Sequence, residues 1–331
     1  MKLENTIKTF VQNRLEKSNM LKNIYYFGKN PSKNLQNLFP DTYSGAKHYN
    51  SIMKLINFVP YIRSISLRRK FLKNSKNLNN ILPSNGFAKI NFKHSKDLTS
   101  VIELSKKSLN DSLKKETKDF NQKKDFLLTK NINVLKDKFL PLRKLIKSND
   151  FLSPITEYLG SFPILWSSQV WFSPNKKFTL GRSQNYHMDN EDYRQIKCFI
   201  PLEDINDENG PLTIIDANKT MKIFKKLKQE KIIKYKHTKI SDEIMYKLHD
   251  ENESIKLTAK VGEILYVDTS RCYHYGSRPS PKNRKVLFLQ FFSINSRKVN
   301  VFQKKYNQNL LDNIEREIYK FYNPDDYFEK H

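Results

Sequence analysis

Cysteine, glycine and long apolar runs are all scarce in this chain of 331 residues. Its two cysteines, Cys198 and Cys272, exclude a disulfide scaffold and a zinc ribbon, both of which need more thiols. No stretch approaches the roughly 18 uncharged apolar residues that a membrane-spanning helix needs. The first twenty residues also lack the apolar centre and the small-residue cleavage site of a secretory signal. We therefore expect a soluble, globular protein located in the cytoplasm.

Positive charge, in contrast, is abundant, because 60 lysines and arginines face 34 acidic residues and leave a net charge of +26. Such an excess is typical of proteins that bind nucleic acid or an anionic membrane surface. Lysine greatly outnumbers arginine, however, and arginine is the better residue for bidentate contacts with phosphates and bases. The chain is also rich in Asn, Ile, Tyr and Phe and holds only 8 glycines, a bias that A/T-rich codons produce by themselves.

The charge is unevenly distributed along the chain. Residues 1–80 contain 15 basic and 3 acidic side chains, whereas residues 181–210 contain seven acidic and three basic ones. A groove for a polyanion would not be lined by that acidic stretch, which disfavours a nucleic-acid partner. Within the basic part, residues 51–71 mix apolar positions with a basic end. They are expected to form a helix packed on the main domain, and the alternative is a peripheral contact with a membrane surface.

Changes in composition divide the chain into three parts. Residues 1–80 are expected to form a basic helical extension, and residues 298–331 a C-terminal segment with one helix. The main domain is expected over residues 81–297. Residues 219–256 show a helical pattern and are predicted to be an insertion between strands.

Within the main domain the pattern changes from helix to strand. Residues 108–138 are lysine-rich and helix-compatible, and a helix over 142–159 should end at Gly160. Segments rich in β-branched and aromatic residues predict strands over residues 164–172, 196–202, 212–215, 263–275 and 284–293. Short strands in series, without a helix between each pair, indicate an antiparallel sandwich or jelly roll rather than a parallel sheet.

The sharpest local signal is the tetrapeptide Tyr186-His187-Met188-Asp189. Side chains two apart on a strand share a face, so His187 and Asp189 can converge on one point. His274 lies 87 residues further on, near the end of another predicted strand. Two histidines and a carboxylate form the facial triad of non-haem iron(II) oxygenases, which leaves coordination positions open. With seven histidines in the chain, a chance pairing is the alternative.

Three further polar residues are candidates for the same site. Arg284 follows His274 by ten residues at the head of the next strand, where it could hold a dicarboxylate or be an ordinary strand-edge arginine. Gln184 could contact a cosubstrate or cap its strand. Lys197 could face the pocket or solvent.

Strand alternation also predicts part of the pocket wall. Phe288 and Gln290 should lie on the same strand face as Arg284, so that this face forms a largely apolar wall that carries the charged group of Arg284. We expect Trp171 in the core, and His249, which lies in the helical insertion, on the surface.

Three segments occur in an order that is typical of one enzyme family. Residues 82–90 resemble its first strand, residues 183–212 its metal-binding stretch with an Asn-Gly-Pro turn, and residues 261–292 its closing hairpin. Together they resemble the phytanoyl-CoA dioxygenase-like family of iron(II)- and 2-oxoglutarate-dependent oxygenases, over residues 82–297. The chain departs from the family after Leu212, where the family often has a Pro-Gly-Ser-His-like turn, so the namesake substrate does not carry over.

The resemblance implies a mainly β fold with flanking helices, around a double-stranded β-helix of the jelly-roll, cupin-like type. It implies iron(II) held by His187, Asp189 and His274, with 2-oxoglutarate chelating the iron and its far carboxylate paired with Arg284. Gln184 and Lys197 are expected to be the other cofactor-binding residues. The implied reaction uses O2, releases succinate and CO2, and hydroxylates a small or medium organic substrate.

Two other classes of function stay open at this stage. A catalytically silent barrel would bind a ligand or partner without chemistry, and a nucleic-acid-binding protein would use the positive charge. The intact triad with Arg284 disfavours the first, and the acidic stretch disfavours the second. The sequence sets neither the substrate nor the oligomeric state.

Overall fold

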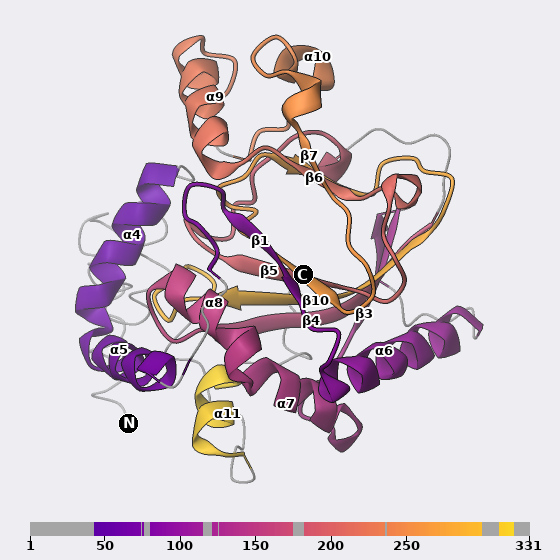
Figure 1. Ribbon diagram of the computed structural model, residues 1–331. Coiled ribbons are helices and arrows are strands. Elements are labelled where there is room, and N and C mark those ends of the chain that lie inside the picture. Colours follow the sequence, from indigo (N-terminus) through magenta and orange to yellow (C-terminus); the bar gives the residue numbers. More distant parts are fainter. Residues whose placement is uncertain are drawn as a thin grey trace, which may run out of the picture.

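Two antiparallel sheets form the centre of the protein, as the computed structural model shows (Figure 1). The structure describes residues 43–73, 75, 80–114, 121–124, 126–174, 182–235, 237–299 and 311–320. In this part of the chain the larger sheet has seven strands in the order β1-β8-β5-β10-β4-β3-β2, and the smaller sheet has the order β7-β6-β9. The strands are β1 (Phe87–Asn91), β2 (Asn121–Lys124), β3 (Leu127–Asn131), β4 (Ile164–Ser173), β5 (Ile196–Pro201), β6 (Leu212–Ile214), β7 (Ile255–Leu257), β8 (Glu263–Val267), β9 (His274–Tyr275) and β10 (Arg284–Phe292).

The path of the chain from β4 onward identifies the fold. It leaves the larger sheet after β4, passes the edge of the smaller sheet through a bridge between His187 and His274, and returns as β5. It then forms β6 and β7 in the smaller sheet, β8 in the larger, β9 in the smaller and β10 in the larger. This alternation between two facing sheets is the double-stranded β-helix, a jelly roll. The predicted fold class is confirmed.

The alternation of β10 separates the two sides of the larger sheet. Leu287, Leu289 and Phe291 face outward and pack against side chains of the helices that cover the larger sheet. Val286 and Phe288 face inward and pack between the two sheets. Both faces are therefore shielded from water, which explains why β5 and β10 read as near-continuous apolar runs.

Helices surround this barrel (Figure 1). They are α4 (Tyr43–Ile56), α5 (Phe58–Lys73), α6 (Lys96–Lys114), α7 (Leu140–Lys147), α8 (Asn149–Leu159), α9 (Ala217–Gln229), α10 (Asp242–Met245) and α11 (Asn313–Ile318). Helices α6, α7 and α8 pack with the outer face of the larger sheet, and α5 packs on α8. Helices α9 and α10 lie between β6 and β7 in the sequence and stand apart from the others, at the top of Figure 1. In the described residues no helix combines the length and apolar character that crossing a membrane would require.

Three of the expected elements differ from the structure. The lysine-rich residues 108–138 were expected to be helical, but α6 ends at Lys114 and the strands β2 and β3 follow. β3 pairs with β4, so tertiary pairing overrides the helix-compatible composition. The expected helix over 142–159 is broken at Ser148, whose backbone is extended, although its end at Gly160 is confirmed by a left-handed C-cap.

The third difference concerns residues 263–275, which form two strands rather than one. A turn separates β8 from β9, because the Asp268 carboxylate accepts a hydrogen bond from the backbone N–H of Ser270 at 3.0 Å. The second Asp268 oxygen accepts from the Tyr158 hydroxyl at 2.7 Å, which anchors the turn to α8. The turn re-aims the chain so that His274 enters the smaller sheet.

Candidate metal centre

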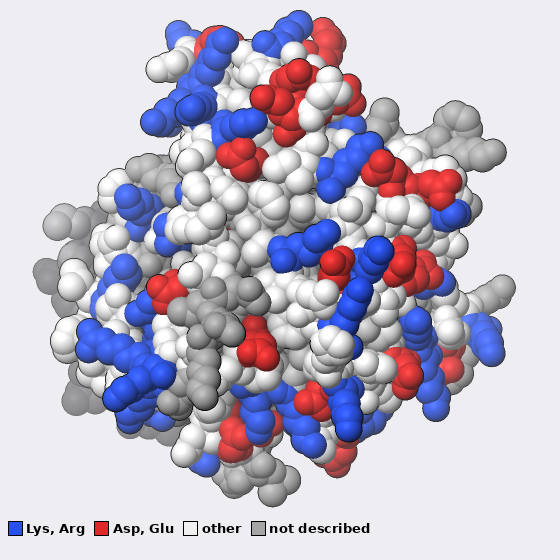
Figure 2. Space-filling model, in the orientation of Figure 1, with Lys and Arg blue, Asp and Glu red and all other residues white. Residues whose placement is uncertain are grey.

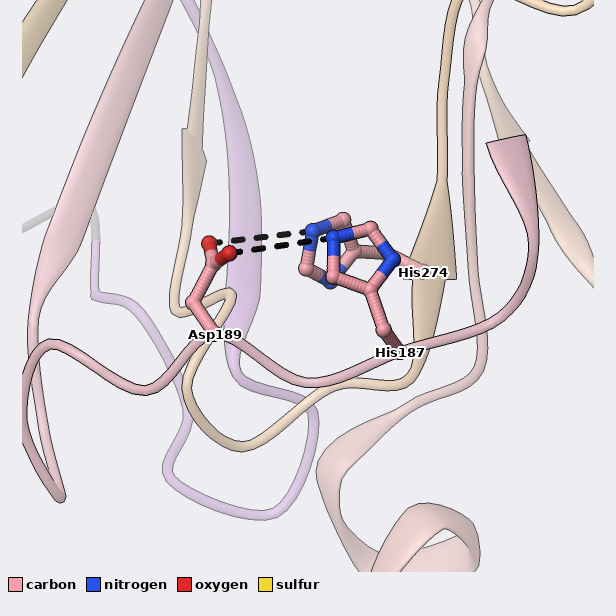
Figure 3. Close-up of side chains that lie close together, drawn as sticks. All are labelled: His187, Asp189 and His274. Carbon is pink, nitrogen blue, oxygen red and sulfur yellow. Dashed lines mark ion pairs between the residues drawn. The ribbon is translucent and has the colours of Figure 1, made fainter. Parts of the chain in front are cut away.

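The side chains of His187, Asp189 and His274 converge inside the barrel (Figure 3). One possible ligand atom from each residue lies within 4.8 Å of the other two. Asp189 Oδ1 is 3.8 Å from His187 Nε2, and Asp189 Oδ2 is 3.7 Å from His274 Nε2. Two ligands of one ion, with bonds of about 2 Å, lie at such separations. The structure thus brings together the three residues that the sequence singled out.

Backbone hydrogen bonds hold the three residues in register. The N–H of His187 donates to the carbonyl of His274 and the N–H of His274 donates to the carbonyl of His187, both at 3.0 Å. The N–H of Asp189 donates to the carbonyl of Thr269 at 2.9 Å. The extended segment around His187 therefore runs beside β9 and the turn before it, and its alternation turns both ligand side chains inward.

Both imidazoles direct their Nε2 atoms toward the carboxylate. His187 Nδ1 lies 2.8 Å from the carbonyl oxygen of Asn185, and His274 Nδ1 lies 3.0 Å from that of Cys272. A carbonyl oxygen can only accept, so we assign a proton to Nδ1 of each ring. Burial, together with the neighbouring His187, lowers the pKa of His274 to about 3, which keeps its ring neutral. Two imidazole nitrogens and a carboxylate that converge on one point form a donor set that fits iron(II).

Lys197 supplies a positive charge beside the triad. Its Nζ lies 2.6 Å from Asp189 Oδ2 and 3.7 Å from Glu191 Oε1. Burial opposes ionisation of Asp189, but the charge of Lys197 holds the pKa of that carboxyl well below its usual range. Lys197 is buried on β5 and lines the cavity, so it faces the pocket rather than solvent.

Arg284 is a buried cation in the same cavity. Its Nη1 donates to the Gly210 carbonyl at 2.7 Å and its Nη2 to the Ser277 hydroxyl at 2.8 Å, while Nε has no hydrogen-bond partner. Burial lowers the pKa of Arg284 to about 10, and in the described part of the chain it forms no ion pair with a carboxylate. A buried guanidinium without a counter-charge is costly, so an anion that entered the cavity would be stabilised there.

Gln184 contacts Ser277, a neighbour of Arg284, and does not line the cavity. It is fully buried in a short turn, and its amide donates to the Ser277 carbonyl at 2.6 Å. This hydrogen bond holds Ser277, whose hydroxyl accepts a hydrogen bond from Arg284.

The cavity has a volume of about 440 Å³ and joins the triad to Arg284. Phe288 and Gln290 line it from β10, as strand alternation predicts. Trp171 was expected in the core but also lines the cavity, because its ring stacks on that of Phe288 with centroids 4.0 Å apart. Thr129 on β3 is a wall residue that the sequence did not indicate, since its segment was assigned to a helix.

A larger hollow of about 770 Å³ lies away from the triad, between α9 and residues 246–253. Charged side chains of both signs line it, including Lys219 and Glu253, which pair at 3.0 Å. His249 was expected on the surface but is buried, since its Nε2 lies within hydrogen-bond distance of the Ser254 hydroxyl at 3.1 Å.

Comparisons with known proteins give no assignment at the level of sequence. No protein-family model matches the chain, and no curated protein is similar to it. Solved structures with a similar arrangement include EctD from S. alaskensis with 2-oxoglutarate and 5-hydroxyectoine, at 15% identity and a TM-score of 0.46, covering 67% of this chain and 80% of that one.

Two further structures are similar to the same extent. HygX from Streptomyces hygroscopicus, with nickel and 2-oxoglutarate bound, is 13% identical with a TM-score of 0.41 and covers 63% of this chain and 84% of its own. The epimerase SnoN, in complex with Fe3+, alpha ketoglutarate and nogalamycin RO, is 10% identical with a TM-score of 0.43. The match covers 69% of this chain and 84% of SnoN. Scores at this level support no inference about activity, so the function below rests on the geometry of this chain.

Proposed function

We propose that the protein is a non-haem iron(II)- and 2-oxoglutarate-dependent dioxygenase that hydroxylates a small or medium organic molecule. The observation that carries the proposal is the convergence of two imidazole nitrogens with the Asp189 carboxylate in a cavity that also holds the buried Arg284. A metal site and an anion site share one cavity, which is what a metal-bound dicarboxylic cosubstrate needs.

His187, Asp189 and His274 would hold the iron in this proposal. When bound, iron(II) supplies the activation of O2 that drives oxidation of the substrate, with 2-oxoglutarate converted to succinate and CO2. The protein contributes two imidazoles with fixed orientation, because both Nδ1 atoms are tied to backbone carbonyls. Three protein ligands leave coordination positions for the cosubstrate and for O2.

Arg284 would bind the far carboxylate of 2-oxoglutarate. Its two terminal nitrogens are held by Gly210 and Ser277, so the guanidinium keeps one orientation, as a charge-assisted contact requires. Lys197 would add a second positive charge to the cavity that receives the dianion. We assign Gln184 a positioning role, through Ser277.

The aromatic wall would shield the reaction from water. Trp171 stacks on Phe288, and Phe199 meets both rings edge-on, with centroids 5.9 and 5.6 Å away. An apolar wall beside the metal limits the water that could quench the oxidant before it reaches the substrate.

The test is an anaerobic titration of the iron(II)-loaded protein with 2-oxoglutarate. A visible metal-to-cosubstrate charge-transfer band should appear and saturate, and oxygen should then yield succinate. His187→Ala should give neither band nor succinate while remaining folded. A protein that takes up iron but shows no band and no succinate would be the catalytically silent barrel instead.

The domain boundaries and the location also belong to the proposal. Residues 81–297 would be the oxygenase domain with its insertion at 219–256, a division supported by β1 beginning at Phe87 and β10 ending at Phe292. The cytoplasmic location remains a prediction, which cell fractionation would check.

A further inference from the structure

Four large apolar side chains stand exposed where α4 meets α5. Leu55 and Val59 are each 75% exposed, Phe58 is 59% exposed and Ile62 is 50% exposed. Among the described residues nine large hydrophobic side chains are exposed, and four of them come from these eight consecutive positions. We call these four residues the apolar corner.

The apolar corner occupies one side of the helical segment. Its members are spaced by three, one and three residues, the pattern of a single helical face. The helical phase continues across the junction, because the N–H of Asn57 donates to the Met53 carbonyl at 2.8 Å and the N–H of Tyr61 donates to the Asn57 carbonyl at 2.7 Å. The four side chains therefore project in a common direction.

The opposite side of the same helices is anchored to the barrel domain. This agrees with the expectation that residues 51–71 pack on the main domain. Asn57 donates from its amide to the Asn295 side chain at 3.4 Å, and Asn50 donates to the Asn295 carbonyl at 3.2 Å. The Ser64 hydroxyl accepts from the Phe162 N–H at 3.0 Å. These buried contacts fix the rotation of the helices, so the apolar corner cannot turn inward without breaking them.

The charge of this segment has one sign. Residues 43–73 contain seven lysines and arginines and no acidic residue. Arg63 and Arg68 pair with Glu317 and Glu157 of other elements. The remaining cations include the exposed residues Lys47, Arg69, Lys70 and Lys73. Blue side chains gather at the lower left of Figure 2, where Figure 1 places α5, whereas both signs are mixed over much of the face in view.

We propose that the apolar corner and its flanking cations bind the surface of an anionic lipid bilayer. Leu55, Phe58, Val59 and Ile62 would insert at the boundary between headgroups and acyl chains, and the lysines and arginines would contact the anionic headgroups. Projecting apolar side chains suit a fluid lipid surface, whereas a protein partner would have to offer a matching groove. The inference stands independently of the oxygenase proposal.

The test is flotation of the full-length protein with vesicles of phosphatidylcholine alone or mixed with phosphatidylglycerol. We expect binding to the anionic vesicles to be about ten-fold stronger than to the neutral ones, and to weaken as salt is added. Leu55→Ser with Phe58→Ser should lower anionic binding about ten-fold, because two inserted side chains are lost. Leu82→Ser with Ile232→Ser is the matched control, since these exposed apolar residues lie elsewhere and should leave binding unchanged.

Fluorescence separates insertion from simple charge attraction. Phe58→Trp should shift its emission to the blue on anionic vesicles, whereas Leu82→Trp should show no shift. Lys70→Gln with Lys73→Gln should weaken binding to the anionic vesicles without changing the melting temperature.

Three results would overturn the proposal. The folded chain could fail to bind either type of vesicle, as it would if another part of the chain covered the apolar corner. The Leu55→Ser, Phe58→Ser variant could bind as well as the unmodified chain. Light scattering could show a dimer that the same variant converts to a monomer without any vesicle binding, which would assign the corner to a second copy.

Discussion

Lys197 Nζ lies 2.6 Å from Asp189 Oδ2, so the carboxylate of the triad has a buried positive partner within the protein itself. The pair joins β5 to the segment that carries His187. Without it, Asp189 would face the two imidazoles with no compensating charge. The lysine therefore stabilises the assembled triad in a protein without a bound metal ion.

The first prediction follows from this pair. Lys197→Met should lower the free energy of unfolding of the metal-free protein by about 3 kcal/mol, because a largely buried carboxylate loses its partner. Urea unfolding with a chelator present would measure the change. Adding Asp189→Asn to Lys197→Met should recover most of the loss, and equal stability of the single variant and the unmodified chain would contradict the stabilising role.

The second prediction concerns the ligands. His187→Ala and Asp189→Ala should each abolish succinate formation and iron(II) binding, because two donors cannot replace the three that converge. Metal content after dialysis and succinate assays measure this. His94→Ala removes an exposed histidine and should retain both properties. Activity in either ligand variant would remove that residue from the site.

The third prediction concerns Arg284. Arg284→Met should raise the 2-oxoglutarate concentration needed for half-maximal binding by about 100-fold, the loss expected for a buried charge-assisted contact. Arg284→Lys keeps the charge but not the bidentate geometry. Its affinity for 2-oxoglutarate should therefore lie between those of the unmodified protein and Arg284→Met. Isothermal titration of the metal-loaded protein would measure both. Unchanged cosubstrate affinity would place the anion elsewhere.

The fourth prediction uses the two tryptophans as a matched pair. Trp171 stacks on Phe288 in the cavity wall, whereas Trp166 packs edge-on against Phe292 in a separate cluster. Binding of metal and 2-oxoglutarate should quench the fluorescence of Trp171. This quenching should be absent in Trp171→Phe and present in Trp166→Phe. The reverse pattern would show that the cosubstrate does not bind beside this wall.

The fifth prediction concerns the turn before β1. Gly86 has a φ of +77°, and a Cβ there would lie 2.7 Å from Cys272 Sγ, two residues before His274. Gly86→Ala should therefore destabilise the protein by about 2 kcal/mol or more, through backbone strain and crowding together. Gly160 has a φ of +67° with nothing near its Cβ position, so Gly160→Ala should cost about 1 kcal/mol. Thermal unfolding of both variants compares the two costs.

Sequence patterns predicted those parts of the fold whose residues are covered on both sides. Strands β5 and β10 are runs of buried side chains, and their composition alone identifies them. The spacing of His187 and Asp189 was informative because a strand places such residues on one face. Partners far apart in the sequence could not be predicted. The ion pair of Lys197 with Asp189 and the hydrogen bond of Gln184 with Ser277 depend on how the loops are placed in the folded protein.

Two parts could not be predicted because tertiary contacts decide them. The turn at Asp268 interrupts a strand-like sequence, and its cause is a side chain that bonds Ser270 locally and Tyr158 on a distant helix. The strand β3 lies in a lysine-rich stretch and gains its conformation by pairing with β4, so no local signal placed Thr129 in the cavity wall. In both cases a partner far along the chain selects the conformation.

The reciprocal backbone bonds between His187 and His274 make the closure of the barrel and the assembly of the triad a single event. Any parting of the smaller sheet at this point would carry the two imidazoles away from each other and release whatever they hold. An ion held by both imidazoles would therefore be lost if the two segments parted, so a substrate would have to enter the cavity without separating them.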